Sequence, residues 1–230
     1  MMPRLQPRSK SPRWGLLEYR SGACALIVAA VLLLTGCTQQ IQGTAVTTAG
    51  SGRAATGDGG ECAEVSAPLA DIPTKGTREP RLRIPIPSGW ERNDLMDSQV
   101  IRYAIVAKGL ASGRFAPNAV VTLESVRGIQ PAEIVFEENR SNLVQLMGAS
   151  NLNTESNTTC GFPSETTDYI APAMGPAPER PIIMHAVVAS NGTTTYLATL
   201  TIQAATDDNP EYRDDAQEIV DGFQLLLRDE

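Results

Sequence analysis

Stretches in which apolar and polar residues alternate recur along the chain from residue 81 onward. This period of two is typical of strands with one buried face. The clearest stretch is 118–126, which is rich in β-branched residues. The segments 182–189 and 194–203 flank Asn191-Gly192, a dipeptide that predicts a hairpin. Weaker alternation predicts further strands over 81–86, 100–107, 151–159 and 162–170.

Helical periodicity replaces alternation in one segment near the middle of the chain. Pro131 suits the first turn of a helix, and Gly148 suits its end. Asn139 falls on the predicted apolar face, either as a ligand contact or as a satisfied polar residue at the boundary of that face. The apolar members of the face are Ala132, Val135, Phe136, Leu143, Leu146 and Met147.

A second helix is predicted at the end of the chain, where Asn209 caps it and Pro210 fits its first turn. Gly222 inside this helix suggests a close approach to another element. The apolar stripe comprises Tyr212, Ala216, Ile219, Val220, Phe223, Leu226 and Leu227. Runs of hairpin-linked strands with two separated helices predict an α+β fold, an antiparallel sheet with helices packed on its faces.

Three residues outside these elements are candidates for a binding surface. Trp90 follows the turn Pro87-Ser88-Gly89 and is either a core anchor or a ligand-stacking residue. Phe115 lies in a glycine-containing loop. Pro176 lies in the proline-rich segment 171–181, which is either a surface excursion or a flap.

The first 36 residues combine a basic leader, a short apolar run and Leu34-Thr35-Gly36 before Cys37, the order of a lipoprotein signal peptide. The run of about a dozen apolar residues is shorter than the roughly 20 of a spanning helix. We therefore expect Cys37 to become the first mature residue and to carry lipid. The alternatives are an uncleaved membrane anchor, or an ordinary signal with a chance cysteine.

The segment 37–60 is rich in Gly, Thr, Ala and Ser, which predicts a flexible tether before a single domain over 61–230. The leader holds five of the 19 basic and one of the 26 acidic residues, so the mature chain keeps 14 and 25 and a net charge near −11. Such a surface repels nucleic acid and anionic headgroups.

The four cysteines fall into distinct roles. Cys24 lies in the apolar run of the leader, and Cys37 is the lipidation site. Cys62 and Cys160 remain as one pair in an oxidising compartment, which predicts a disulfide between them. A metal site needs more Cys or His than the chain offers, because His185 is the sole histidine.

The residue patterns give no support for catalysis. A Ser/His/Asp triad has little to build on with one histidine, and the sequence contains no nucleophile elbow or nucleotide-binding glycine pattern. The paired acids Glu137-Glu138, Asp207-Asp208 and Asp214-Asp215 are adjacent, so on a helix they point about 100° apart. We predict no enzyme activity, no cofactor and no metal.

The signal motif, the segments 84–92 and 115–121, Thr159-Cys160-Gly161 and the closing helix together resemble the mycobacterial LpqN/LpqT-type lipoproteins. The resemblance implies an α-β-α sandwich similar to the PsbP and Mog1 proteins, which bind and assemble other proteins. We expect a lipoprotein on the outer face of the cell membrane that binds an envelope protein partner. Partial release from the membrane is left open. The alternative is a carrier or sensor of an apolar envelope molecule, and a hydrolase is the third hypothesis.

Overall fold

The computed structural model describes residues 60–175 and 177–228. The predicted signal peptide, Cys37, Pro176 and nearly all of the predicted tether lie outside these residues. Within the described part, no helix is long and apolar enough to cross a membrane. The helices are α1 (Ala132–Gln145), α2 (Pro210–Asp221) and a 3₁₀ turn (Lys108–Leu110). The strands are β1 (Leu69–Ile72), β2 (Arg81–Pro85), β3 (Glu91–Arg92), β4 (Ile101–Val106), β5 (Asn118–Arg127), β6 (Ser150–Thr159), β7 (Phe162–Ala171), β8 (Arg180–Asn191), β9 (Thr194–Gln203) and β10 (Gln224–Leu226).

Seven strands form one antiparallel sheet in the order β3-β4-β5-β9-β8-β7-β6. Two-residue loops connect β6 to β7 and β8 to β9. Cys160 and Gly161, with φ of 50° and 83°, form the first loop, and both positive values fit the turn that matches strand twist. Gly192 and Thr193 form the second loop at the predicted Asn-Gly signal. The prediction of successive antiparallel strands, made from the alternation of apolar and polar residues, is confirmed.

A second, three-stranded sheet has the order β1-β2-β10. β2 pairs antiparallel with both neighbours, although β10 lies some 140 residues further along the chain. The sequence predicts β2, but β1 and β10 are not predicted. The final helix was predicted to run through Leu226 and Leu227, and this prediction is wrong because residues 224–226 form β10.

Gly222, predicted to lie inside the last helix, forms its C-terminal cap. A Cβ atom at this position would lie 2.5 Å from Val65 Cγ2 and 2.6 Å from Pro85 Cγ, so only glycine lets α2 approach β2 this closely. The close approach suggested by the sequence is confirmed. The chain leaves the helix at Gly222, and the residues that follow pair with β2.

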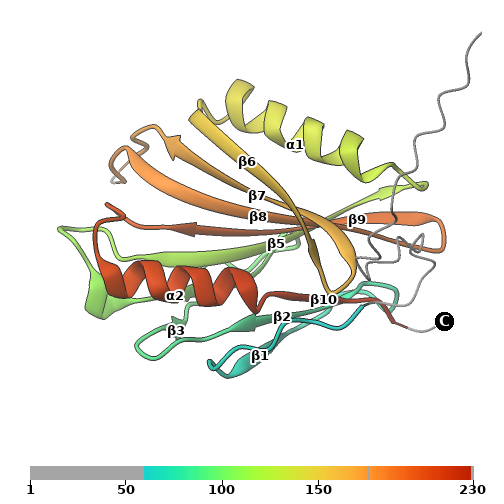
Figure 1. Cartoon of the computed structure of the whole chain (residues 1–230), viewed down its shortest axis with the longest axis horizontal. Helices are drawn as coiled ribbons and strands as arrows, with labels where there is room; N and C mark the ends of the chain where they lie inside the picture. The colour runs from blue at the N-terminus through green and yellow to red at the C-terminus, as the bar shows by residue number, and fades with distance from the viewer. Residues whose placement is uncertain (1–59, 176, 229–230) are drawn as a thin grey trace, which may run out of the picture. The chain divides into compact units, whose positions relative to one another are not determined.

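The main hydrophobic core lies between one face of the large sheet and a layer made of α2 and the small sheet (Figure 1). From α2, Tyr212, Ala216 and Ile219 are buried, and Asn209 caps the helix by accepting a hydrogen bond from the Tyr212 N–H. The large sheet contributes alternate residues of its central strands, including Val121, Val187, Ala198, Leu200 and Ile202. An α+β chain with antiparallel sheets and two helices is therefore confirmed.

Helix α1 packs on the opposite face of the large sheet, over β7 and β8 (Figure 1). Phe136 contacts the Ala186 and Val188 cluster, and Leu143 contacts the cluster that includes Tyr169. The predicted apolar face of α1 is only partly right. Leu146 and Met147 are 75% and 54% exposed, because the helix ends at Gln145 and the chain turns there toward β6.

Candidate functional site: the groove between α1 and β5

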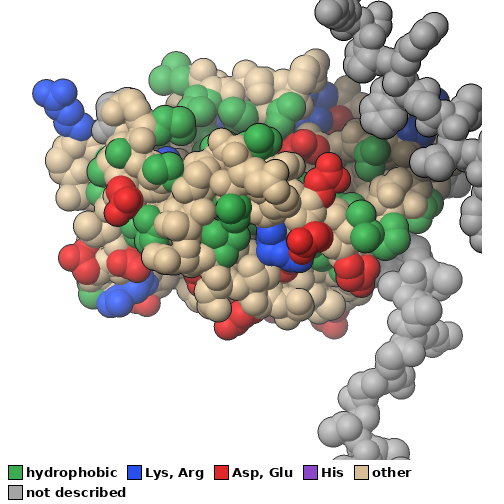
Figure 2. Space-filling model, turned by 90° about the horizontal axis from the view of Figure 1, so that it is seen from above, with side chains coloured by type: hydrophobic (Ala, Val, Ile, Leu, Met, Phe, Trp, Pro, Cys, Tyr) green, Lys and Arg blue, Asp and Glu red, His purple; other side chains and the backbone are tan. Residues whose placement is uncertain are grey.

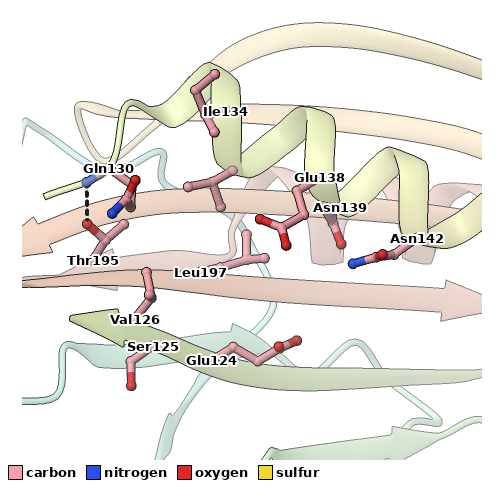
Figure 3. A pocket seen from close by; sticks show the side chains of 11 residues that line it. Glu124, Ser125, Val126, Gln130, Ile134, Glu138, Asn139, Asn142, Thr195 and Leu197 are labelled. Carbon is pink, nitrogen blue, oxygen red and sulfur yellow. Dashed lines mark hydrogen bonds between the residues drawn. The ribbon is translucent and has the colours of Figure 1, made fainter. Parts of the chain in front are cut away.

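A groove of about 430 Å³ separates α1 from strand β5 on the α1 face of the large sheet (Figure 3). It exists because α1 lies over β7 and β8 and leaves the outer part of the β5–β9 surface uncovered. One wall is α1, the other is the end of β5, and β9 contributes Leu197 between them (Figure 3). The lining residues are Glu124, Ser125, Val126, Gln130, Ile134, Val135, Glu138, Asn139, Asn142, Thr195 and Leu197.

The β5 wall follows from the alternation of that strand. Ala119, Val121 and Leu123 point into the main core, so the residues between them point to the α1 face. Beyond Leu123 the same alternation places Glu124 and Val126 on the groove side, and both are exposed. Strand periodicity therefore extends past the region that α1 covers.

Thr195 positions the segment that leads from β5 into α1. Its side chain is 1% exposed. Its Oγ1 accepts a hydrogen bond from the Gln130 N–H at 2.9 Å and donates one to the Gly128 carbonyl at 2.8 Å. Gly128 has φ of 94°, a conformation that favours glycine. These contacts set the start of α1 relative to β9, and no sequence pattern singled out Thr195.

Polar contacts hold the sheet side of α1. Arg140 forms ion pairs with Glu165 of β7 and with Glu137. Burial raises the pKa of the Glu165 carboxyl, and the Arg140 guanidinium opposes this by favouring the ionised form. Asn139 donates a hydrogen bond to Met184 Sδ at 3.6 Å while it also lines the groove. Asn139 is thus a satisfied residue at the boundary of the face, one of its two predicted roles.

Apolar and acidic side chains share the groove surface. Val126 and Ile134 are 49% and 59% exposed. Glu124 and Glu138 are exposed, and within residues 60–175 and 177–228 neither forms an ion pair. Seen from the side of α1, hydrophobic side chains reach the surface in separate patches with acidic side chains among them (Figure 2).

The structure does not bring the predicted surface residues together at this groove. Trp90 is 5% exposed, and its indole N–H donates to Asp215 Oδ2 of α2 at 2.7 Å. It is a core anchor, and its assignment to a binding surface is corrected. Phe115 is partly buried, with the Arg180 guanidinium 5.3 Å from its ring centroid. Pro176 lies outside the described residues.

The disulfide between Cys62 and Cys160 is present, with an S–S distance of 2.03 Å. It joins the segment before β1 to the β6–β7 turn, beside a second hollow of about 650 Å³. His185 lines this hollow but is only 3% exposed. Its Nε2 and Nδ1 lie 2.8 Å from the hydroxyls of Thr159 and Thr166. Burial lowers the pKa of His185 to about 4.

This environment leaves His185 neutral near pH 7 and engaged at both ring nitrogens. A histidine that acts as a general base needs a free nitrogen within reach of substrate. No cluster of three or more His, Cys, Asp or Glu side chains suited to a metal ion occurs in the part of the chain that the structure describes.

Comparison with known proteins decides the family. The family model described as "Probable lipoprotein LpqN" (Lpp-LpqN) matches residues 68–226, which leaves out only residues 60–67 and 227–228 of the described part. The chain belongs to this family. The matched region contains both walls of the groove as well as both sheets. No curated protein matches the chain.

The solved structures that resemble this chain do so at low sequence identity, and the LpqN structure shows the same fold. The crystal structure of LpqN, involved in cell envelope biogenesis of Mycobacterium tuberculosis, is 16% identical with a TM-score of 0.55, covering 69% of this chain and 91% of that one. The Ran-binding protein Mog1p of Saccharomyces cerevisiae is 11% identical over 70% and 96% of the two chains, with a TM-score of 0.42. PA94 of Pseudomonas aeruginosa, a protein of unknown function, is 18% identical over 65% of this chain and 91% of that one, with a TM-score of 0.37.

Proposed function

We propose that this LpqN-family lipoprotein is a non-catalytic binding module that engages another protein of the cell envelope through the groove between α1 and β5. The observation that carries the proposal is the groove itself. It exposes large apolar side chains, Val126 and Ile134, beside the carboxylates of Glu124 and Glu138, which form no ion pair with another described residue. Exposed apolar side chains next to a concave surface are typical of protein-interaction sites.

The envelope setting of this proposal has two supports. The family is one of lipoproteins, and a structurally similar member is described as involved in cell envelope biogenesis. We also propose that the layers formed by α1, the large sheet and α2 with the small sheet correspond to the α-β-α sandwich implied by the resemblance. In this orientation α1 is an outer layer, which leaves its groove open to a partner.

A carrier role has less support from the groove. Pockets for apolar molecules are lined mainly by hydrophobic and aromatic side chains. Seven of the eleven residues that line this groove are polar, and the four apolar ones are aliphatic. The composition of the walls fits a protein surface better than it fits a lipid tail.

We propose further that lipid on Cys37 holds the domain at the outer face of the membrane. A chain with Cys37→Ala should be found in the soluble fraction or the medium, because acyl chains contribute about 0.8 kcal/mol per buried methylene to anchoring. Membrane fractionation and mass analysis of the mature N-terminus measure this directly. Unchanged membrane association of the variant would contradict the lipid anchor.

The groove is tested by a matched pair of substitutions in the lipidated protein. Ile134→Asp should reduce crosslinking to the envelope partner roughly tenfold or more, because an apolar contact at the centre of an interface is replaced by a charge. Leu146→Asp is the control, since Leu146 is 75% exposed but lies outside the groove. In-cell crosslinking followed by mass spectrometry gives the readout. An equal loss of crosslinking in both variants, or no loss in either, would contradict the proposal.

A further inference from the structure

The two walls of the groove carry matching residues in matching order. On β5, Val126 and Glu124 are two residues apart on the same face of the strand, a separation of about 6.7 Å. On α1, Ile134 and Glu138 are four residues apart on the same face of the helix, a separation of about 6 Å. In Figure 3, Val126 and Ile134 lie toward one end of the groove, and Glu124 and Glu138 lie on opposite walls further along it.

The groove therefore has an apolar end followed by an anionic one. Leu197 lies between the walls, and Asn142 extends the polar end along α1. The carboxylates differ from others on this face, because Glu137 and Glu165 are both paired with Arg140. In the described residues, no Lys or Arg lines the groove. Among the described residues that line the groove, two carboxylates are therefore balanced by no cationic side chain.

We propose that the groove receives a segment of the partner protein that presents a large apolar side chain next to a lysine or arginine on one face. The apolar side chain would lie between Val126 and Ile134, and the cation between Glu124 and Glu138. The proposal rests on the function proposed above and specifies the chemistry of the partner. The spacing of about 6–7 Å equals that of residues two apart in an extended segment or four apart in a helix.

Charge favours a basic protein segment over other occupants. The chain carries a formal net charge of −7, so a basic segment is attracted to it before contact. A divalent cation would need more ligands than two carboxylates, and the structure offers no such cluster in the part of the chain that it describes. Lysine and arginine also have apolar stems, which suits a site where aliphatic and acidic side chains adjoin.

Peptide selection on the purified mature lipoprotein tests this inference. A displayed library of random 12-residue peptides would be selected on the wild-type protein, and the affinity of the enriched peptides would be measured at low and high salt. We expect enrichment of Lys or Arg two or four positions from a large apolar residue. The double variant Glu124→Gln/Glu138→Gln should weaken binding about fivefold to tenfold, and added salt should weaken wild-type binding by a similar factor.

A charge-matched double variant controls for the general acidity of the protein. Glu133→Gln/Glu211→Gln removes the same charge from exposed positions outside the groove and should leave affinity unchanged. Equal weakening by both double variants, or selected peptides without basic residues, would overturn the inference. Peptides whose binding depends on Ile134 but not on the two carboxylates would overturn the inference alone. If no selected peptide depends on Ile134, the proposed groove function fails as well.

Discussion

Removal of the disulfide between Cys62 and Cys160 should lower the free energy of unfolding by about 4–5 kcal/mol. The two cysteines are 98 residues apart, and closing a loop of about 100 residues restricts the unfolded chain by about 4.7 kcal/mol in the chain-entropy model. For a domain of this size, the loss corresponds to a decrease of roughly 10–20 °C in Tm. Cys160 is also buried in the main core, so its environment adds to the sensitivity of this site.

The measurement compares thermal and denaturant unfolding of the oxidised protein with and without reductant. The double variant Cys62→Ser/Cys160→Ser should unfold like the reduced protein, and reductant should not change it further. This control separates the effect of the bond from any effect of the reductant. Identical midpoints for oxidised and reduced wild-type protein would show that the disulfide contributes no stability.

Acidification from pH 7 to pH 4 should cost the native state about 3 kcal/mol through His185 alone. Burial lowers the pKa of His185 to about 4, whereas an unfolded chain binds the proton near pH 6.5. Between these values the unfolded state binds more protons than the native state, so stability falls as the pH falls. The carboxylate of Asp221 has the opposite effect but does not outweigh burial.

Unfolding curves at several pH values between 7 and 4, for wild-type protein and His185→Gln, measure this contribution. The variant keeps polar groups near Thr159 and Thr166 but has no histidine proton to bind, so its stability should depend less on pH over this range. Because His185 is the sole histidine, its ring protons also report the pKa directly by NMR. Titration near pH 6.5 would contradict the burial argument. Arg102 lowers the pKa of Glu79 from 4.5 to about 2, so the stability that this carboxyl contributes is lost as the pH falls from about 5 toward 2. This loss overlaps the lower end of the range but is common to wild-type protein and His185→Gln.

Local sequence patterns predicted the elements whose contacts lie mostly within one segment or between strands that follow each other in the chain. The alternation of apolar and polar residues predicted strands β5, β8 and β9, and the residue type of Asn209 predicted the N-terminal cap of α2. The small sheet was not predicted, because β10 is three residues long and pairs with β2 from far along the chain. A three-residue strand carries no periodicity of its own, and in the sequence the helical spacing of apolar residues in α2 continues through it.

The groove was harder to predict because it depends on where α1 lies. The sequence placed Leu146 and Met147 on the buried face of that helix and gave Ile134 no role. The contacts of α1 with the sheet join residues that are distant in sequence: Phe136 and Leu143 pack on β7 and β8, Arg140 pairs with Glu165, and Thr195 binds the segment before the helix. One sequence signal bears on the groove. The strand alternation of β5 continues through Glu124 and Val126, which indicates that the strand extends beyond the part of the sheet that α1 covers.

The most direct test of the central claim is photo-crosslinking from inside the groove. A photo-reactive amino acid at position 134 of the lipidated protein should form an adduct with one envelope protein. The yield of this adduct should fall when Glu124 and Glu138 are replaced by Gln, and the same probe at position 146 should not form the adduct. Identical adducts from positions 134 and 146, or none from position 134, would contradict binding of a protein partner in the groove.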